Sequence, residues 1–239
     1  SLPLDMLGGA RRAGALALRI EPSLEALLEL LAAGYPVVVL QNLSLSWYPM
    51  WHYALVVGYD RSGQRITLRS GREARQVLPL ATFDRTWARS GRWAMIATPP
   101  GDIPPGAAAG AYTEAALALE RTGQIAAARV AYAAGAGHWP DELPLRIGLA
   151  NVAMAAGDRA AAEQALREAV RRHPRSDAAL NNLAHLLADT GRPDEAEALA
   201  TAATGLRGPH EATARRTLEE IRATRTPPGT NRAQSLEIP

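Results

Sequence analysis

The spacing of hydrophobic and polar residues changes near residue 100, and the two parts of the chain predict different architectures. In the first part, helical patterns alternate with short apolar runs. An amphipathic helix is predicted near 3–14 and a short strand at 16–20. A second helix follows Ser23, whose hydroxyl can cap it, and Gly34 ends this helix. The chain therefore begins as a unit that mixes helices and strands.

Three further apolar runs have the length of strands, and a helix and one more strand follow them. Two of these runs, HYALVVGYD and RITLRS, flank the turn Asp60–Gly63, which is the layout of a β-hairpin. In chain order, the predicted elements are strands at 36–40, 52–60 and 65–70, a helix at 79–89 and a strand at 92–98.

After a segment rich in proline and glycine at 99–106, helical patterns repeat with a period of 34 residues. A turn glycine recurs at Gly123, Gly157 and Gly191. Small residues, suited to close helix crossings, stand at matching places around each glycine: Ala116, Ala150 and Ala184 before it, and Ala128, Ala162 and Ala196 after it. A helix–turn–helix repeat of this length resembles the tetratricopeptide repeat. We expect three repeats at 107–208, a capping helix at 209–225 with Leu218 and Ile221 inward, and a disordered tail at 226–239.

Composition is that of a globular protein, because 47% of the 239 residues are hydrophobic and 21% are charged. All 26 basic residues are arginine, and the net charge is only +2. No arginine run is interleaved with aromatic residues, so we expect no nucleic-acid binding. No apolar run reaches the roughly 20 residues that span a bilayer, so we expect no transmembrane segment. The bias toward arginine, alanine, glycine and proline indicates a GC-rich bacterial genome.

The chain has no cysteine, which excludes disulfides and thiolate metal ligands within these residues. We predict no metal and no cofactor. One histidine stands out, because His52 opens the strand HYALVVGYD beside the aromatic segment WYPMW. Imidazole is the usual general base for a thiol or hydroxyl nucleophile. The alternative is a structural histidine whose ring is held by a backbone carbonyl.

Several stretches of the first 98 residues resemble one family: SLPLDMLGGARRAG, AAGYPVVVLQNLSLSWYPMWHYALVVGYD, ITLRSG and FDRTWARSGRWAM. They are similar to papain-like cysteine peptidases of the C39 (double-glycine leader peptidase) type, in a bacterial subgroup with C-terminal tetratricopeptide repeats. The resemblance implies a partial α+β papain-like domain at 1–98, a linker at 99–106 and an all-α tetratricopeptide solenoid. Such relatives are often exported or lipid-anchored, and the compartment of this chain stays unknown.

By this resemblance, His52 is the general base for a cysteine that lies upstream of Ser1 at the start of a helix. A helix N-terminus lowers the pKa of such a thiol and supplies oxyanion donors. An Asp or Asn that orients the imidazole is expected at the end of the next strand, where this chain has Ser70. A serine stabilises an imidazolium less than a carboxylate does. Asp60 lies roughly 26 Å along the strand from His52, so we predict a turn residue there.

Other polar and aromatic residues could bind a peptide. Near His52, the predicted cleft residues are Gln41, Asn42, Trp47 and Trp51, although strand-end capping by the first two and packing by the tryptophans are alternatives. We assign Trp87 and Trp93 to packing. In tetratricopeptide repeats the first helix of each pair lines a groove, and by position this groove contains Asn151, Met154, Asn181 and His185. We expect a peptide or protein partner there.

Two functions from different classes are compatible with these features. The first is the C-terminal part of a cysteine peptidase with a repeat module for binding partners, inactive in this chain because the nucleophile is absent. The second is a non-catalytic, peptidase-like scaffold that binds peptides. The retained His52 favours the first function, and Ser70 in place of a carboxylate favours the second.

Overall fold

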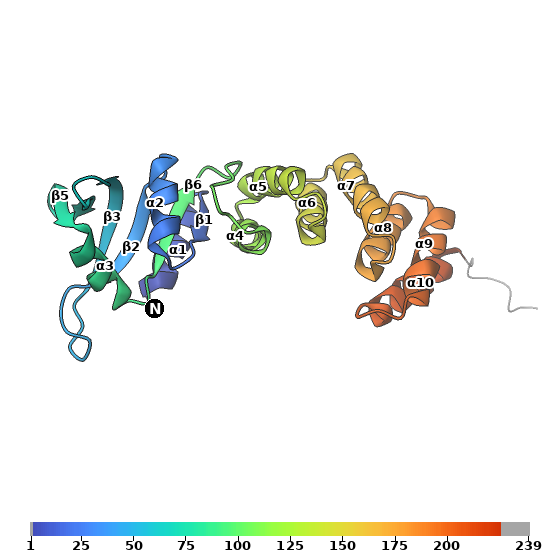
Figure 1. The fold of residues 1–239 in the computed structure, drawn as a ribbon. Coiled ribbons are helices and arrows are strands. Elements are labelled where there is room, and N and C mark those ends of the chain that lie inside the picture. The colour runs from blue at the N-terminus through green and yellow to red at the C-terminus, as the bar shows by residue number, and fades with distance from the viewer. Residues whose placement is uncertain (1, 226–239) are drawn as a thin grey trace, which may run out of the picture. The chain divides into compact units, whose positions relative to one another are not determined.

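The computed structural model describes residues 2–225 (Figure 1). These described residues fall into two compact units that divide between Leu145 and Arg146. The first unit contains the sheet and two helices of the repeat region, and the second contains helices only among its described residues. The tail predicted at 226–239 lies outside the described residues. An N-terminal antiparallel sheet with helices, followed by a run of helices, is the fold class that the sequence predicted.

The sheet has six antiparallel strands in the order β1-β6-β2-β3-β4-β5. Five helices of this unit, α1 to α5, accompany the sheet. Its strands are β1 (Leu16–Arg19), β2 (Val37–Asn42), β3 (Trp51–Asp60), β4 (Arg65–Ser70), β5 (Glu73–Pro79) and β6 (Ala94–Thr98). The helices are α1 (Leu2–Arg12), α2 (Leu24–Ala32), α3 (Leu80–Ala88), α4 (Ala109–Arg121) and α5 (Ile125–His138).

The two faces of the sheet carry different helices. On one face Leu7 of α1 packs in a cluster with Leu40 and Trp93. The residue after Leu40 points to the opposite face because side chains alternate along a strand. There α3 packs on the sheet and buries Phe83 and Trp87 completely. The alternation along β2 and β3 thus decides which side chains meet α3.

Most elements of this unit match the sequence prediction, including the hairpin turn. Oδ1 of Asp60 accepts hydrogen bonds from the backbone N–H groups of Ser62 and Gly63, so Asp60 is a turn residue, as predicted. A hydrogen bond from the Ser62 hydroxyl, together with these backbone bonds, lowers the pKa of Asp60. The prediction missed β5, an edge strand that pairs with β4. Its residues are mostly exposed and include Glu73 and Arg75, so no apolar alternation marks it.

The first helical hairpin, α4 and α5, belongs to the same compact unit as the sheet. Oη of Tyr112 on α4 donates to the carbonyl oxygen of Pro100 at 3.0 Å and so fixes the segment between the sheet and α4. Burial raises the pKa of Tyr112 to about 12. Nε2 of Gln124 donates to the carbonyl oxygen of Arg12 at the end of α1. This hairpin is therefore tied to the sheet region by specific polar contacts.

The second unit is built from helices that pack closely against one another at buried alanines. Its helices are α6 (Leu143–Ala155, from Arg146 onward), α7 (Arg159–Arg172), α8 (Asp177–Asp189), α9 (Pro193–Gly205) and α10 (Glu211–Arg225). The turn glycines Gly157 and Gly191, like Gly123 in the first unit, all have φ of 77°. The predicted crossing residues Ala184 and Ala196 are fully buried, and Leu218 and Ile221 of α10 point inward as predicted.

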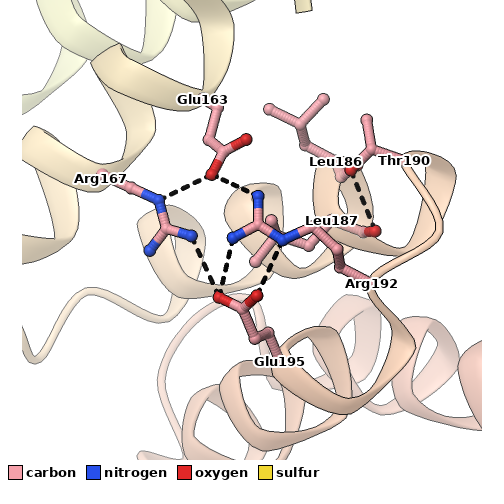
Figure 2. Close-up of polar contacts among 7 residues, drawn as sticks. All are labelled: Glu163, Arg167, Leu186, Leu187, Thr190, Arg192 and Glu195. Atoms are coloured by element: carbon pink, nitrogen blue, oxygen red, sulfur yellow. Dashed lines mark hydrogen bonds and ion pairs between the residues drawn. The ribbon is translucent and has the colours of Figure 1, made fainter. Parts of the chain in front are cut away.

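A cluster of two arginines and two glutamates lies on the surface of this unit (Figure 2). Oε1 of Glu163 on α7 accepts from Nε of Arg167 at 2.8 Å and from Nη1 of Arg192 at 2.6 Å. Both arginines also donate to Glu195 on α9. The cluster joins α7 to the start of α9, so it connects neighbouring helical pairs.

Candidate functional site

The side chains of His52 and Ser70 are in contact. The sequence analysis placed Ser70 where the family has the residue that orients the imidazole. Nε2 of His52, on the second residue of β3, lies 2.7 Å from Oγ of Ser70 at the end of β4. A serine hydroxyl can accept a hydrogen bond from a protonated Nε2. In that tautomer Nδ1 holds the lone pair that a general base needs. The contact therefore fits an imidazole ring whose orientation is fixed through Nε2 and whose Nδ1 is available to accept a proton.

Gln41 supports this arrangement from the neighbouring strand. Gln41 is paired with His52 across β2 and β3, so both side chains lie on the face that α3 covers. Nε2 of Gln41 donates to Oγ1 of Thr86 on α3 at 2.7 Å, and the Gln41 residue is only 1% exposed. The hydroxyl of Thr86 in turn bonds the carbonyl oxygen of Phe83. These bonds hold the sheet against α3 beside the imidazole. The Gln41 side-chain nitrogen is therefore hydrogen-bonded within the protein.

Asn42 uses its side chain to fold the loop that follows β2. Its Oδ1 accepts from the backbone N–H groups of Ser44 at 3.0 Å and Met50 at 2.9 Å, and its Nδ2 donates to the carbonyl oxygen of Leu45. Asn42 is as buried as Gln41. Nη1 of Arg89, just after α3, donates to the carbonyl oxygen of Ser44 at 2.7 Å. Asn42 thus closes the loop, which is the capping alternative of the sequence analysis.

The tryptophans divide into exposed and buried pairs. Trp47 and Trp51 are exposed, and Trp51 lies on the opposite face of β3 from its neighbour His52. Trp87 and Trp93 are buried, and Nε1 of Trp87 donates to the carbonyl oxygen of Trp93, which confirms the packing assignment. A role of the exposed pair as walls of a peptide cleft stays a prediction.

The sequence analysis missed two residues, one on α3 and one just after its C-terminus. Thr86 holds Gln41, and Arg89 holds the loop after β2. Both lie more than 40 residues along the chain from their partners, so no local pattern connects them. Their spacing of three on one predicted helix, which places them on one helix face, was the available signal.

The predicted groove residues of the repeats lie on two helices of the second unit. Asn151 and Met154 are on α6, and Asn181 and His185 are on α8. Asn151 and His185 are exposed, and Nδ1 of His185 lies 3.4 Å from the carboxylate of Asp189. Asn181 is 6% exposed, and its Oδ1 has no hydrogen-bond partner. A buried amide oxygen without a partner can accept a bond from a bound molecule.

Within residues 2–225, His, Asp and Glu do not gather into a group of three that could hold a metal ion. Over the same described residues, each helix is too short or too polar to cross a membrane.

Family comparisons match both parts of the chain. Residues 14–95 match the model of the peptidase C39 like family, and residues 147–211 match that of the tetratricopeptide repeat. Both matches confirm the resemblances found in the sequence. The curated proteins contain no match to this chain.

Solved structures with similarity to this chain contain tetratricopeptide folds. The Yersinia enterocolitica type III secretion chaperone SycD, in complex with a peptide of the translocator YopD, is 17% identical with a TM-score of 0.44, and the match covers 48% of this chain and 92% of that chain. The first tetratricopeptide domain of Spaghetti (RPAP3), bound to an HSP90 peptide, is 19% identical with a TM-score of 0.45, covering 48% and 91%. From the family matches, the chain carries a peptidase C39-like region followed by tetratricopeptide repeats.

Proposed function

We propose that His52 and Ser70 form the base half of a Cys–His peptidase site whose thiol comes from outside these 239 residues. The observation that carries the proposal is the 2.7 Å contact between Nε2 of His52 and Oγ of Ser70. Since the sequence contains no cysteine, this chain alone does not hydrolyse peptides. The family match of residues 14–95 supports the choice of a thiol as the missing partner.

In this mechanism the chain contributes proton transfer. Nδ1 of His52 takes the proton of the thiol, the thiolate attacks a peptide carbonyl carbon, and the imidazolium returns its proton to the leaving amine. Water then hydrolyses the thioester. Ser70 keeps the ring in the required orientation through Nε2, with less stabilisation of the imidazolium than a carboxylate gives.

The repeats form the second part of the proposal, a surface that binds a peptide or protein partner. The residues that we propose for this surface are Asn151, Met154, Asn181 and His185. The buried Oδ1 of Asn181 has no hydrogen-bond partner among the described residues, so it can accept a backbone N–H of the partner once the side chain turns toward the surface. The domain organisation that we propose places the peptidase-like region at 1–98 and the repeats at 107–208. A non-catalytic peptide-binding scaffold is the alternative, and Ser70 in the place of a carboxylate favours it.

Thiol labelling of the full-length gene product tests the proposal. Near pH 6 an ordinary thiol, with a pKa of about 8.5, is almost fully protonated and reacts slowly with iodoacetamide. We expect rapid single-site labelling, detected by intact mass, that slows at least about tenfold in His52→Ala. Ser70→Ala should slow it less, and Ser70→Asp should restore or exceed the wild-type rate because a carboxylate stabilises the imidazolium better.

Matched controls separate this chemistry from general damage. His185→Ala removes an exposed histidine of the other unit, and Ser62→Ala removes an exposed turn serine, so both should label like wild type. Labelling that is absent or indifferent to His52 would establish the scaffold alternative. In that case Asn181→Leu, which keeps the branched shape of the side chain and removes the amide, should still abolish peptide binding by the repeats, measured by calorimetry.

A further inference from the structure

The loop between β2 and β3 displays large apolar side chains to solvent. Trp47 is 81% exposed and Tyr48 is 69% exposed. Figure 1 shows this loop extending beyond the end of the sheet. Contiguous apolar exposure of this kind marks a contact surface. The apolar loop, as we define it, consists of Leu43, Leu45, Trp47, Tyr48, Met50 and Trp51, all of them exposed.

Part of the backbone of the apolar loop is hydrogen-bonded within the loop and its base. The N–H of Leu43 donates to the carbonyl oxygen of Met50, and the N–H of Tyr48 donates to that of Leu45. Asn42 accepts from two further loop N–H groups, and Arg89 donates to the carbonyl oxygen of Ser44. Pro49 has no N–H to satisfy. Each of these internal hydrogen bonds lowers the cost of moving the loop toward the acyl chains, because an unpaired backbone group is costly where water is absent.

The charge distribution favours a lipid surface. The segment LSLSWYPMW contains no side chain that is charged at neutral pH, so its entry into a bilayer interface meets no charge penalty. Arg89 lies at the base of the loop, and exposed Arg72 lies two residues after Ser70, beside Glu73. Cations next to an apolar surface attract anionic headgroups. Trp and Tyr concentrate at membrane interfaces, where the ring is buried and the polar atom stays hydrated.

The shape of the loop distinguishes a bilayer from a protein partner. Consecutive residues Trp47 and Tyr48 are both exposed, with ring centroids 6.3 Å apart and planes tilted by 54°. Exposed apolar residues occur at both odd and even positions of this loop, so they are not confined to one alternating set of positions. A protein groove contacts one face of such a loop, whereas a bilayer interface surrounds the tip.

We propose that the apolar loop inserts into the interface of an anionic lipid bilayer and holds the peptidase-like region at the membrane surface. Trp47 and Tyr48 lie at the boundary of headgroups and acyl chains, and Arg89 and Arg72 face the headgroups. The contact is interfacial and does not involve a spanning helix. It stands independently of the chemistry proposed for His52, so either proposal can fail alone.

Vesicle binding tests the insertion with the 239-residue chain. Vesicles of equal parts phosphatidylcholine and phosphatidylglycerol are sedimented with the protein, and tryptophan emission is recorded with and without lipids brominated on the acyl chain. Trp87 and Trp93 are buried and Trp139 is partly buried, so a lipid-induced blue shift and bromine quenching report mainly the exposed Trp47 and Trp51. We expect both signals, with weaker binding to pure phosphatidylcholine.

Replacement of the loop tip should remove the binding. Trp47→Ser combined with Tyr48→Ser should weaken vesicle affinity at least about tenfold, equivalent to about 1.4 kcal/mol. Val130→Ser is the matched control, since Val130 is an exposed apolar residue on α5, away from the loop. It should bind like wild type.

Three results would overturn the proposal. The first is no binding to either vesicle, and the second is binding without quenching of the exposed tryptophans. The third is a dimer in light scattering that the loop-tip variant converts to a monomer, with no vesicle binding, because a second copy would then cover the loop.

Discussion

The sheet region and the second helical unit differ in the size of the side chains at their closest contacts. On the α3 face of the sheet, completely buried Trp87, Phe83 and Ile66 fill the space between strands and helix. In the second unit, buried alanines such as Ala184 and Ala196 let helices approach closely, and the larger buried side chains of this cluster are leucine and isoleucine. The first core should therefore be most sensitive to lost volume, and the second to added volume.

The largest expected effect is the loss of Trp87. Its side chain is completely buried, stacks on Phe83 with ring centroids 5.6 Å apart, and donates a hydrogen bond to the carbonyl oxygen of Trp93. Trp87→Ala should lower the free energy of unfolding by about 3–5 kcal/mol. All five tryptophans precede residue 146, so tryptophan fluorescence during urea unfolding reports the first unit.

Trp47→Ala is the matched control for that experiment, since it removes the same residue type from an exposed position. It should change the free energy of unfolding by less than about 0.5 kcal/mol. Equal effects of the two variants would show that large buried side chains do not hold the sheet region. A smaller loss in circular dichroism at 222 nm than in fluorescence would show that the second unit stays folded.

An added side chain in the second unit should have the next largest effect. Ala196 on α9 is completely buried, so Ala196→Leu forces α9 away from its neighbours and should cost about 1–3 kcal/mol. Ala202→Leu, at an exposed position of the same helix, should cost less than about 0.5 kcal/mol. Urea unfolding followed by circular dichroism measures both. A tolerated Ala196→Leu would remove the contrast between the two cores.

The same contrast explains which parts of the structure were predictable from sequence. Each helical pair depends on contacts within and between adjacent repeats, so a local period identified them, and the turn glycines confirmed it with identical φ values. The hairpin of β3 and β4 was equally local. The edge strand β5 was not predictable, because its exposed residues, among them Glu73 and Arg75, lack a buried alternation.

The candidate site shows a similar division. The contact between His52 and Ser70 follows from two neighbouring strands and from the family resemblance, so the sequence indicated both residues. The bond from Gln41 to Thr86 joins β2 to α3 across 45 residues, and only the folded packing of α3 creates it. Likewise, the sequence alone did not decide that Asn42 closes the loop after β2.

The smallest expected effect concerns the surface cluster that joins α7 to α9. Hydrogen bonds from Arg167 and Arg192 hold the pKa of Glu163 below its usual value of 4.5. The charged form is thus favoured in the folded state, so the stabilisation is present above pH 4.5 and is lost as the pH falls through the lower folded pKa. Glu163→Gln should lower the Tm slightly at pH 7, and the difference from wild type should shrink at acid pH.

Thermal unfolding by circular dichroism between pH 7 and acid pH measures this dependence, with Glu219→Gln as the control at an exposed position of α10. The Glu163 side chain is 24% exposed, so solvent screens the cluster and high salt should reduce the effect further. If Glu163→Gln changed the Tm as much as Ala196→Leu, charge pairs between repeats would matter as much as helix packing. A small effect that depends on pH and salt would instead show that helix packing contributes more to the stability of the second unit than these charge pairs do.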